Sequence, residues 1–470
     1  MKPFHIFNTL TRSVEELKPL NPPTVTLYQC GPTVYLPQHL GNMRAYLFGD
    51  TLKRAMRLAG FNVRHVMNIT DVGHMTSDED EGEDKIEKTA RAQGKSPREI
   101  ADLYLKLFLD DTDALGVERP DVICRATDHI ADMIALIERI LRNGFAYVTK
   151  SGVYFDVEKW RGPSRMGRLS RQSLDEQHAG QRLEHSPDKK SPHDFALWVL
   201  DQPGHIMQWD SPWGRGYPGW HIECSAMSMK YLGETIDMHI GGNDHIAIHH
   251  ENEIAQSESA TGKQFVRYFV HFAFLVGKEG AKISKSSGKF PLLKDLVAAG
   301  ISPMAFRLLC FGAKYRSEIV FTDESVHAAQ KNYEYITGFA RTVQAASPDS
   351  EWAADYLNQF TDALMDDLNT PRALAATLEL VGEAYRRNDH RIWSTLKKMD
   401  KVLGLKVEQY REAVTKAELP KEINDLIAKR EAARAAKNFA EADRLRQEIQ
   451  SRGYDVKDRR GGASSYEPRF

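Results

Sequence analysis

Four side chains of types that bind metal ions occur at positions that a fold could bring together. His249 and Glu253 are four residues apart in a predicted helix, so both side chains share one helix face. Cys30 follows a predicted strand, and Cys224 lies close to the start of a second structural unit. Two thiolates, one imidazole and one carboxylate form a donor set that suits zinc.

The spacing of the two cysteines leaves a second interpretation open. Neither Cys30 nor Cys224 belongs to a CxxC pair, and lone cysteines are more often small buried apolar residues than ligands. Cys124 and Cys310 lie among apolar residues and are predicted to belong to the core. The acidic run 78–84 is a further conceivable metal loop, but it lacks a calcium-loop spacing and is predicted to be a solvated surface loop.

Two other segments could bind phosphate groups. Residues 37–42 open a predicted helix, whose N-terminus attracts anions; His39 could add a donor, and Gly41 would let a flat base pack on the backbone. A loop rich in Gly, Lys and Ser runs from 277 to 289, where Lys282 and Lys285 could clamp a triphosphate and meet the charge of a leaving pyrophosphate. Taken singly, a His and a Gly before a helix, or a surface Lys/Ser loop, are common, and no Walker motif is present.

A strand–helix–strand unit must position the first of these residues. Alternating β-formers at 24–28, helical apolar spacing at 44–59 with Gly60 as its C-cap, and a strand at 61–70 predict a parallel sheet. Active sites in such sheets lie beyond the carboxyl ends of the strands, where Cys30 and Thr70 fall.

The remaining elements extend this architecture. Helices are predicted at about 98–116 and 128–143, an irregular insertion with short strands at 144–208, a strand at 236–240 and a helix at 249–261. From about Asp323 onward strand signals nearly vanish, and 423–449 is predicted to be a helical hairpin bent near 437–438, followed by a mobile tail at 459–465. The basic residues on the outside of this hairpin are also explained by a solvated helix face.

Composition restricts the class of protein. The 470 residues carry 63 Lys and Arg against 65 Asp and Glu, a net charge of −2, which excludes a globally basic protein that coats nucleic acid. No apolar run of membrane-spanning length is present, the first residues lack a signal-peptide pattern, and four cysteines do not make a disulfide scaffold. The composition predicts a multidomain enzyme of the cytoplasm.

Together, these motifs resemble the class I aminoacyl-tRNA synthetases, and within them the cysteinyl-tRNA synthetase family. Residues 39–42 and 282–286 resemble the two class signatures, usually written HIGH and KMSKS. The cysteinyl branch is indicated by three further stretches, at 30–35, 219–227 and 249–258, and the resemblance also includes 365–371 and 440–446.

The resemblance implies a set of site residues. Zinc would be held by Cys30, Cys224, His249 and Glu253, and would bind the thiolate of the substrate cysteine. That substrate would also contact Gly31, Thr70, Trp220 and Asp244. ATP would be bound by His39, Gly41, Asn42, Lys282, Ser284 and Lys285, of which His39, Lys282 and Lys285 would be catalytic.

The resemblance also implies the reaction and the partners. L-cysteine and ATP, with Mg²⁺, would form cysteinyl-adenylate and pyrophosphate, and the acyl group would pass to the 3′-terminal adenosine of tRNA(Cys). Because thiolate binds zinc strongly and a hydroxyl does not, no editing domain is required. The family implies a monomer with no membrane partner. The sequence departs from the family pattern at Asn42, Ile283, 71–75 and 245–248, which leaves all four zinc positions and both signature lysines intact.

The resemblance predicts a Rossmann-like α/β catalytic domain split by an insertion and followed by an α-helical tRNA-binding region. The predicted parts are the two catalytic halves 1–127 and 216–275, the connective insertion 128–215, the signature-loop linker 276–322, the anticodon-binding bundle 323–403, and the hairpin and tail 404–470. Two other functions remain open: a ligase that joins cysteine to an amino sugar, which would lack the tRNA-binding helices, and a non-catalytic RNA-binding relative with a degraded ATP site.

Overall fold

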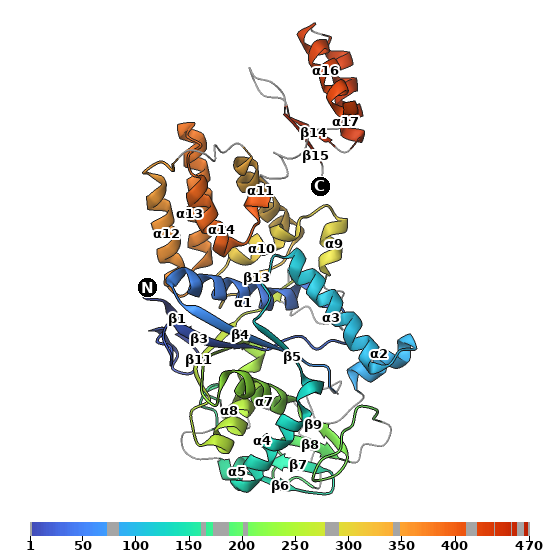
Figure 1. Cartoon of the computed structure of the whole chain (residues 1–470), viewed down its shortest axis with the longest axis vertical. Helices are drawn as coiled ribbons and strands as arrows, with labels where there is room; N and C mark the ends of the chain where they lie inside the picture. The colour runs from blue at the N-terminus through green and yellow to red at the C-terminus, as the bar shows by residue number, and fades with distance from the viewer. Residues whose placement is uncertain are drawn as a thin grey trace. The chain divides into compact units, whose positions relative to one another are not determined.

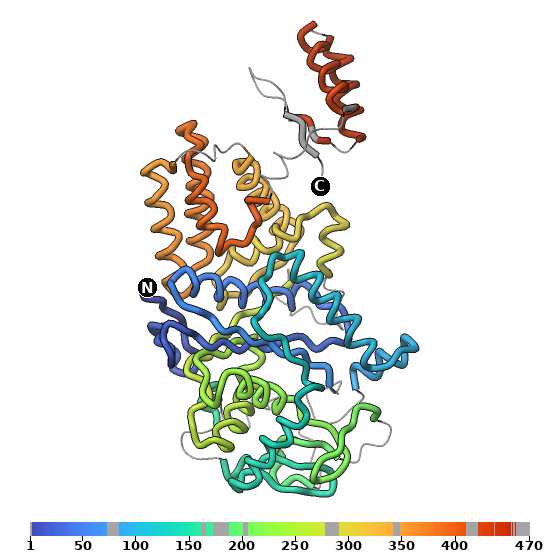
Figure 2. Tube along the Cα trace, in the orientation of Figure 1, coloured from blue at the N-terminus to red at the C-terminus, as the bar shows by residue number. Residues whose placement is uncertain are grey.

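The computed structural model of the chain describes two compact units. They comprise Met1–Tyr335 with Gln344–Leu405, and Ile336–Val343 with Lys406–Phe470; Figure 2 follows the backbone through both. None of the helices in the described part of the chain is long and apolar enough to cross a membrane. The described residues are 2–72, 84–160, 166–172, 188–200, 205–277, 291–341, 348–409, 421–436, 438–452, 454–457 and 465–468.

A five-stranded parallel sheet forms the centre of the larger unit (Figure 1). Its order is β11 (Val266–Phe272), β10 (Ile236–Gly242), β3 (Thr24–Gln29), β4 (Asn62–Ile69) and β5 (Val122–Arg125). The chain runs from β3 to β4 and β5 on one side, whereas β10 and β11 join on the other side of β3. The predicted α/β fold is therefore confirmed, with its topological switch point between β3 and β10.

Each face of this sheet has its own apolar core. Tyr28 and Val66 pack with α4 (Ile130–Arg142), α7 (Trp220–Leu232) and α8 (His249–Thr261). Met67 and Ile69 pack instead with α1 (Leu40–Ala59) and α3 (Pro97–Ala114). The split follows from the strand geometry, because successive side chains of a strand point to opposite faces. Figure 1 shows these helices on the two sides of the sheet.

The short strands predicted in the insertion pair into an antiparallel sheet, whose last strand lies just beyond the predicted boundary at 215. Its strands are β6 (Ala146–Val148), β7 (Gly152–Phe155), β8 (Ala196–Leu200) and β9 (Gly216–Pro218), paired in that order. Short elements surround the two sheets: β1 (His5–Asn8), β2 (Ser13–Glu16), α2 (Lys85–Gln93), η1 (Ala126–His129), α5 (Val157–Trp160), η2 (Asn243–His245), β12 (Leu275–Val276) and β13 (Ile319–Val320).

Helices dominate the described residues after β13. They are α11 (Asp323–Ala340), α12 (Ala353–Met365), α13 (Thr370–Arg387) and α14 (Trp393–Leu403), preceded by α9 (Leu293–Ala298) and α10 (Pro303–Phe311). The smaller unit holds the predicted hairpin as α16 (Lys421–Ala435) and α17 (Phe439–Ser451), with a core that includes Ile423, Leu445 and Ile449.

The expectation that strands vanish after Asp323 is wrong in the smaller unit. There β14 (Tyr454–Lys457) and β15 (Ser465–Pro468) pair antiparallel, and Val456 of β14 joins the hairpin core. Each strand is only four residues long and mostly polar, so the sequence shows no clear alternation of apolar and polar residues there. The two strands are recognised by the hydrogen-bonded pairing between them. Of the predicted mobile tail, 459–464 lies outside the described residues.

Candidate active site

The carboxyl ends of β3, β4 and β10 meet where the candidate substrate residues lie. Cys30 follows β3 directly and its backbone N–H donates to the carbonyl of Ile240 in β10, at 3.4 Å. Thr70 follows β4, and Asp244 lies in η2 just after β10. The switch point therefore gathers three segments that are far apart in the sequence.

Helices α7 and α8 bring the other proposed zinc ligands to the same place. Cys224 lies on α7, and His249 and Glu253 lie one turn apart on α8, with His249 Nε2 2.9 Å from Glu253 Oε1. One donor atom each from Cys30, Cys224, His249 and Glu253 lies within 4.8 Å of all the others. Cys224, His249 and Glu253 are buried, and Cys30 is partly exposed.

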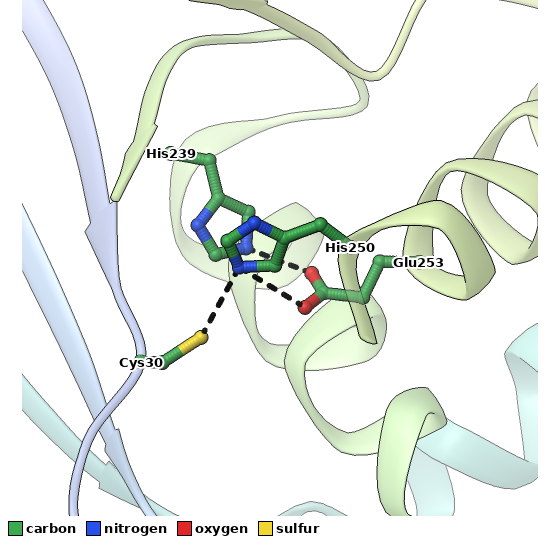
Figure 3. Close-up of side chains that lie close together, drawn as sticks. All are labelled: Cys30, His239, His250 and Glu253. Carbon is green, nitrogen blue, oxygen red and sulfur yellow. Dashed lines mark hydrogen bonds and ion pairs between the residues drawn. The ribbon is translucent and has the colours of Figure 1, made fainter. Parts of the chain in front are cut away.

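A second set of donors shares two of these residues. Cys30, His239, His250 and Glu253 also lie within 4.8 Å of one another, as Figure 3 shows. His239 Nε2 is 2.8 Å from Glu253 Oε2, and His250 Nε2 is 3.6 Å from the Cys30 sulfur. The structure thus surrounds Cys30 and Glu253 with two alternative pairs of partners.

Opposite charges pair with one another inside this cluster. A hydrogen bond with Cys224 holds the pKa of the Cys30 thiol well below its ordinary value, against the effect of burial, and the same contact and burial raise the pKa of Cys224. Burial would raise the pKa of Glu253, but His239 and His249 bring it down to about 2. Burial opposes a charged His249, yet Glu253 and Cys30 raise its pKa to about 10.

The four residues expected to contact the amino acid have different surroundings. Gly31 lies so close to β4 that a Cβ there would be 1.6 Å from the carbonyl oxygen of Asn68, so only glycine fits. The Trp220 ring packs against His249 with ring centroids 4.6 Å apart. Thr70 Oγ1 donates to Glu223 Oε2 at 3.1 Å, and Asp244 lies exposed in η2.

The first signature forms the start of α1. His39 caps this helix: its Nδ1 accepts the backbone N–H of Asn42 at 3.2 Å, while Asn42 Oδ1 faces the His39 N–H at 3.4 Å. The reciprocal cap explains why α1 begins at Leu40, within the residues 37–42 that were predicted to open this helix. Gly41 lies in its first turn. Lys282, Ser284 and Lys285 lie outside the described residues.

Sequence reasoning missed three buried polar residues of this region. They are Glu223, His239 and His250, each 0% exposed. His239 lies in a strand between Met238 and Ile240, and a histidine inside such an apolar run is a signal that could have indicated it. Glu223 Oε1 has no hydrogen-bond partner among the described residues, and burial raises the pKa of this carboxyl well above its ordinary value.

Known protein families match successive parts of the chain. A family model described as "tRNA synthetases class I (C) catalytic domain" matches residues 16–331. A DALR domain matches 359–408, and a "Cysteinyl-tRNA ligase anticodon binding domain" matches 416–464. The fold is similar to that of Mycobacterium tuberculosis methionyl-tRNA synthetase in complex with methionyl-adenylate, with a TM-score of 0.57, 13% identity, and 86% of this chain and 94% of that chain covered. These matches define a class I aminoacyl-tRNA synthetase.

Full-length relatives specify the branch. The chain is 44% identical to Cysteine–tRNA ligase 1 of Burkholderia lata, over 97% of this chain and 95% of the relative. It is 41% identical to the Cysteine–tRNA ligases of Treponema denticola and Thermus thermophilus, over 97% of this chain and 98% of each relative. The chain belongs to the cysteine–tRNA ligase family. The match at 416–464 favours a tRNA ligase over the amino-sugar ligase considered above.

Proposed function

We propose that this protein activates L-cysteine with ATP at a zinc site and transfers the cysteinyl group to the 3′-terminal adenosine of tRNA(Cys). The observation that carries the proposal is the convergence of Cys30, Cys224, His249 and Glu253 within 4.8 Å at the switch point of the sheet. Pyrophosphate would be the product of the first step, and Mg²⁺ would accompany ATP. Membership of the cysteine–tRNA ligase family supports the reaction as a whole.

The donor set fits zinc on an observation that does not depend on the family. Glu253 Oε1 is buried and lies 2.9 Å from His249 Nε2, and the sulfurs of Cys30 and Cys224 are within 4.8 Å of both residues' donor atoms. A buried carboxylate gathered with two sulfurs and an imidazole is a donor set that suits zinc. We favour this set over the one with His239 and His250, because it includes both thiols of the cluster and leaves His239 to orient Glu253.

When bound, zinc would take the substrate's thiolate as a further ligand, which the hydroxyl of serine cannot replace. The chain's own residues would do the rest of the selection. Trp220 packs against His249 and would close one wall of the pocket, while Gly31 keeps the loop after β3 close to β4. Thr70 and Asp244 would hold the substrate's ammonium group.

The start of α1 would hold ATP. The N-terminal end of α1, with His39, Gly41 and Asn42, would face the phosphates and the adenine. Lys282, Ser284 and Lys285 would also bind ATP, and the two ammonium groups would stabilise charge on the leaving pyrophosphate. In the resting structure the His39 ring caps α1, so binding of ATP would compete with that cap.

The helical regions would bind the tRNA. The anticodon-binding match at 416–464 covers α16 and α17, whose outer residues include Arg434, Arg444 and Arg446. We propose that the protein acts as a monomer in the cytoplasm.

Cysteine-dependent ATP–pyrophosphate exchange tests the activation step. Purified protein should exchange pyrophosphate with cysteine and not with serine, and should contain about one zinc per chain. Exchange without zinc would contradict the role of the four ligands, and a full zinc site without exchange would contradict the catalytic assignment.

A further inference from the structure

A second group of metal-binding side chains lies where α2 begins, and it shares no residue with the Cys30 cluster. Asp84 is the N-cap of α2, and Glu87 lies three residues later in the first turn. His205 reaches them from the far end of the insertion, and one donor atom from each of the three lies within 4.8 Å of the others. The two carboxylates face one side because residues three apart on a helix are neighbours.

All three side chains are held inside the protein. The side chains of Asp84, Glu87 and His205 are 2%, 3% and 6% exposed. Glu87 Oε1 accepts the backbone N–H groups of Ile206 at 2.7 Å and Met207 at 3.0 Å, and it contacts His205 Nδ1. The rings of His205 and Tyr217 pack nearly perpendicular to each other, with centroids 4.4 Å apart. The imidazole is therefore fixed before any ligand arrives.

Two atoms of this group point at each other and lack partners. Asp84 Oδ2 and His205 Nε2 are 3.8 Å apart, and neither has a hydrogen-bond partner among the described residues. That separation is too long for a hydrogen bond. If Nδ1–H donates to Glu87, then Nε2 presents a lone pair to the carboxylate, and a cation between the two atoms satisfies both.

The charge and the spacing favour a metal ion over an empty gap. Of the residues that the structure describes, only His205 lies within ion-pair distance of Asp84 or Glu87, so two buried carboxylates face one imidazole. A tetrahedral ion with bonds of about 2.1 Å holds its ligand atoms about 3.4 Å apart, close to the separation seen here. A carboxylate that holds the second nitrogen of a metal-bound histidine is a common supporting contact.

We propose that Asp84, Glu87 and His205 form a second metal site, which takes a divalent ion of the Mn²⁺ to Zn²⁺ series. Asp84 Oδ2 and His205 Nε2 bind the ion, and Glu87 holds the imidazole in place. The oxygen and nitrogen donors of this site suit Mn²⁺, whereas the thiolates of the Cys30 cluster select softer ions. The ion would fasten residues 205–207 of the insertion to α2 of the catalytic domain.

Titration with Mn²⁺ of the full chain carrying one equivalent of zinc, in the absence of ATP, tests the proposal. Electron paramagnetic resonance measures free Mn²⁺, and the filled Cys30 cluster does not compete. The wild-type protein should bind one equivalent, and Asp84→Asn or His205→Gln should weaken that binding by at least about tenfold. Asp110→Asn removes the same charge at an exposed ion pair with Lys106, and it should leave Mn²⁺ binding unchanged.

A parallel titration with Zn²⁺ covers the possibility that Mn²⁺ binds too weakly. If zinc-loaded wild-type protein takes up neither a Mn²⁺ ion nor a second Zn²⁺ ion, the proposal is wrong and a proton occupies the gap. It is equally wrong if the added ion binds as tightly to folded Asp84→Asn and His205→Gln as to the wild type. Pyrophosphate exchange with cysteine reports that these variants are folded.

Discussion

Replacement of Cys224 by serine distinguishes the two possible ligand sets around Cys30. Cys224 is a ligand in the proposed set and a bystander in the set with His239 and His250. In the proposed set His239 supports zinc only through its 2.8 Å contact with Glu253. Cys224→Ser and His239→Gln should therefore lose different amounts of zinc affinity. Which of the two variants loses more reveals which set binds the ion.

The magnitudes follow from these roles. Loss of a supporting contact costs about 10- to 100-fold in metal affinity, which corresponds to about 1.4–2.8 kcal/mol, so we expect this of His239→Gln. Loss of a direct ligand, here one of two thiolates, costs more metal affinity than loss of a supporting contact. Cys224→Ser should therefore lose more than about 100-fold in zinc affinity and should also lose cysteine activation.

Competition between the protein and a chromophoric chelator measures zinc affinity, and pyrophosphate exchange on the same samples measures activation. Cys124→Ser is a matched control, because Cys124 is as buried as Cys224 and its thiol donates to the carbonyl of Met67. It should keep wild-type zinc affinity. Unchanged zinc affinity in Cys224→Ser, with a larger loss in His239→Gln, would refute the proposed ligand set.

Three further predictions concern catalysis and stability. Lys285→Ala should retain zinc and lose pyrophosphate exchange, and normal exchange would remove this lysine from the mechanism. Burial lowers the pKa of His65 to about 3 from 6.5, so the unfolded chain takes up that proton first as pH falls. His65 should thus cost about 2 kcal/mol of unfolding free energy between about pH 7 and about pH 5, and urea titrations of His65→Gln should lack this contribution. Arg307→Met should destabilise the protein by about 1.5–3 kcal/mol, because buried Asp50, 2.6 Å away, loses one charged hydrogen-bond partner and keeps Arg54. Arg57→Met removes an exposed ion pair on the same helix as Asp50 and should cost less than about 1 kcal/mol in the same denaturation assay.

The sequence allowed prediction of the residues whose positions depend on local periodicity. The 3.6-residue period places His249 and Glu253 on one face of α8, and the strand–helix–strand pattern places Cys30 and Thr70 beyond neighbouring strands. The predicted end of α1 at Gly60 also agrees with the structure, where Gly60 adopts a left-handed conformation.

Contacts that depend on packing could not be predicted in this way. His239 reaches Glu253 from a strand, and His205 reaches Glu87 from the end of the insertion, although no local pattern relates these residues. The acidic run 78–84 was expected to be a solvated loop, yet its last residue, Asp84, is buried as the cap of α2. A charged residue in a polar run gives no sign of burial, because its partner lies elsewhere in the chain.

Aminoacylation of tRNA(Cys) by the zinc-loaded protein tests the central claim most directly. Cysteine and serine are compared as substrates, and the charged tRNA is measured. If the thiolate is recognised at the Cys30 cluster, the protein should attach cysteine to the tRNA and should not attach serine. Cys224→Ser should lose this attachment of cysteine, and Cys124→Ser should keep it. Equal attachment of serine, or unchanged cysteine attachment in Cys224→Ser, would contradict that claim.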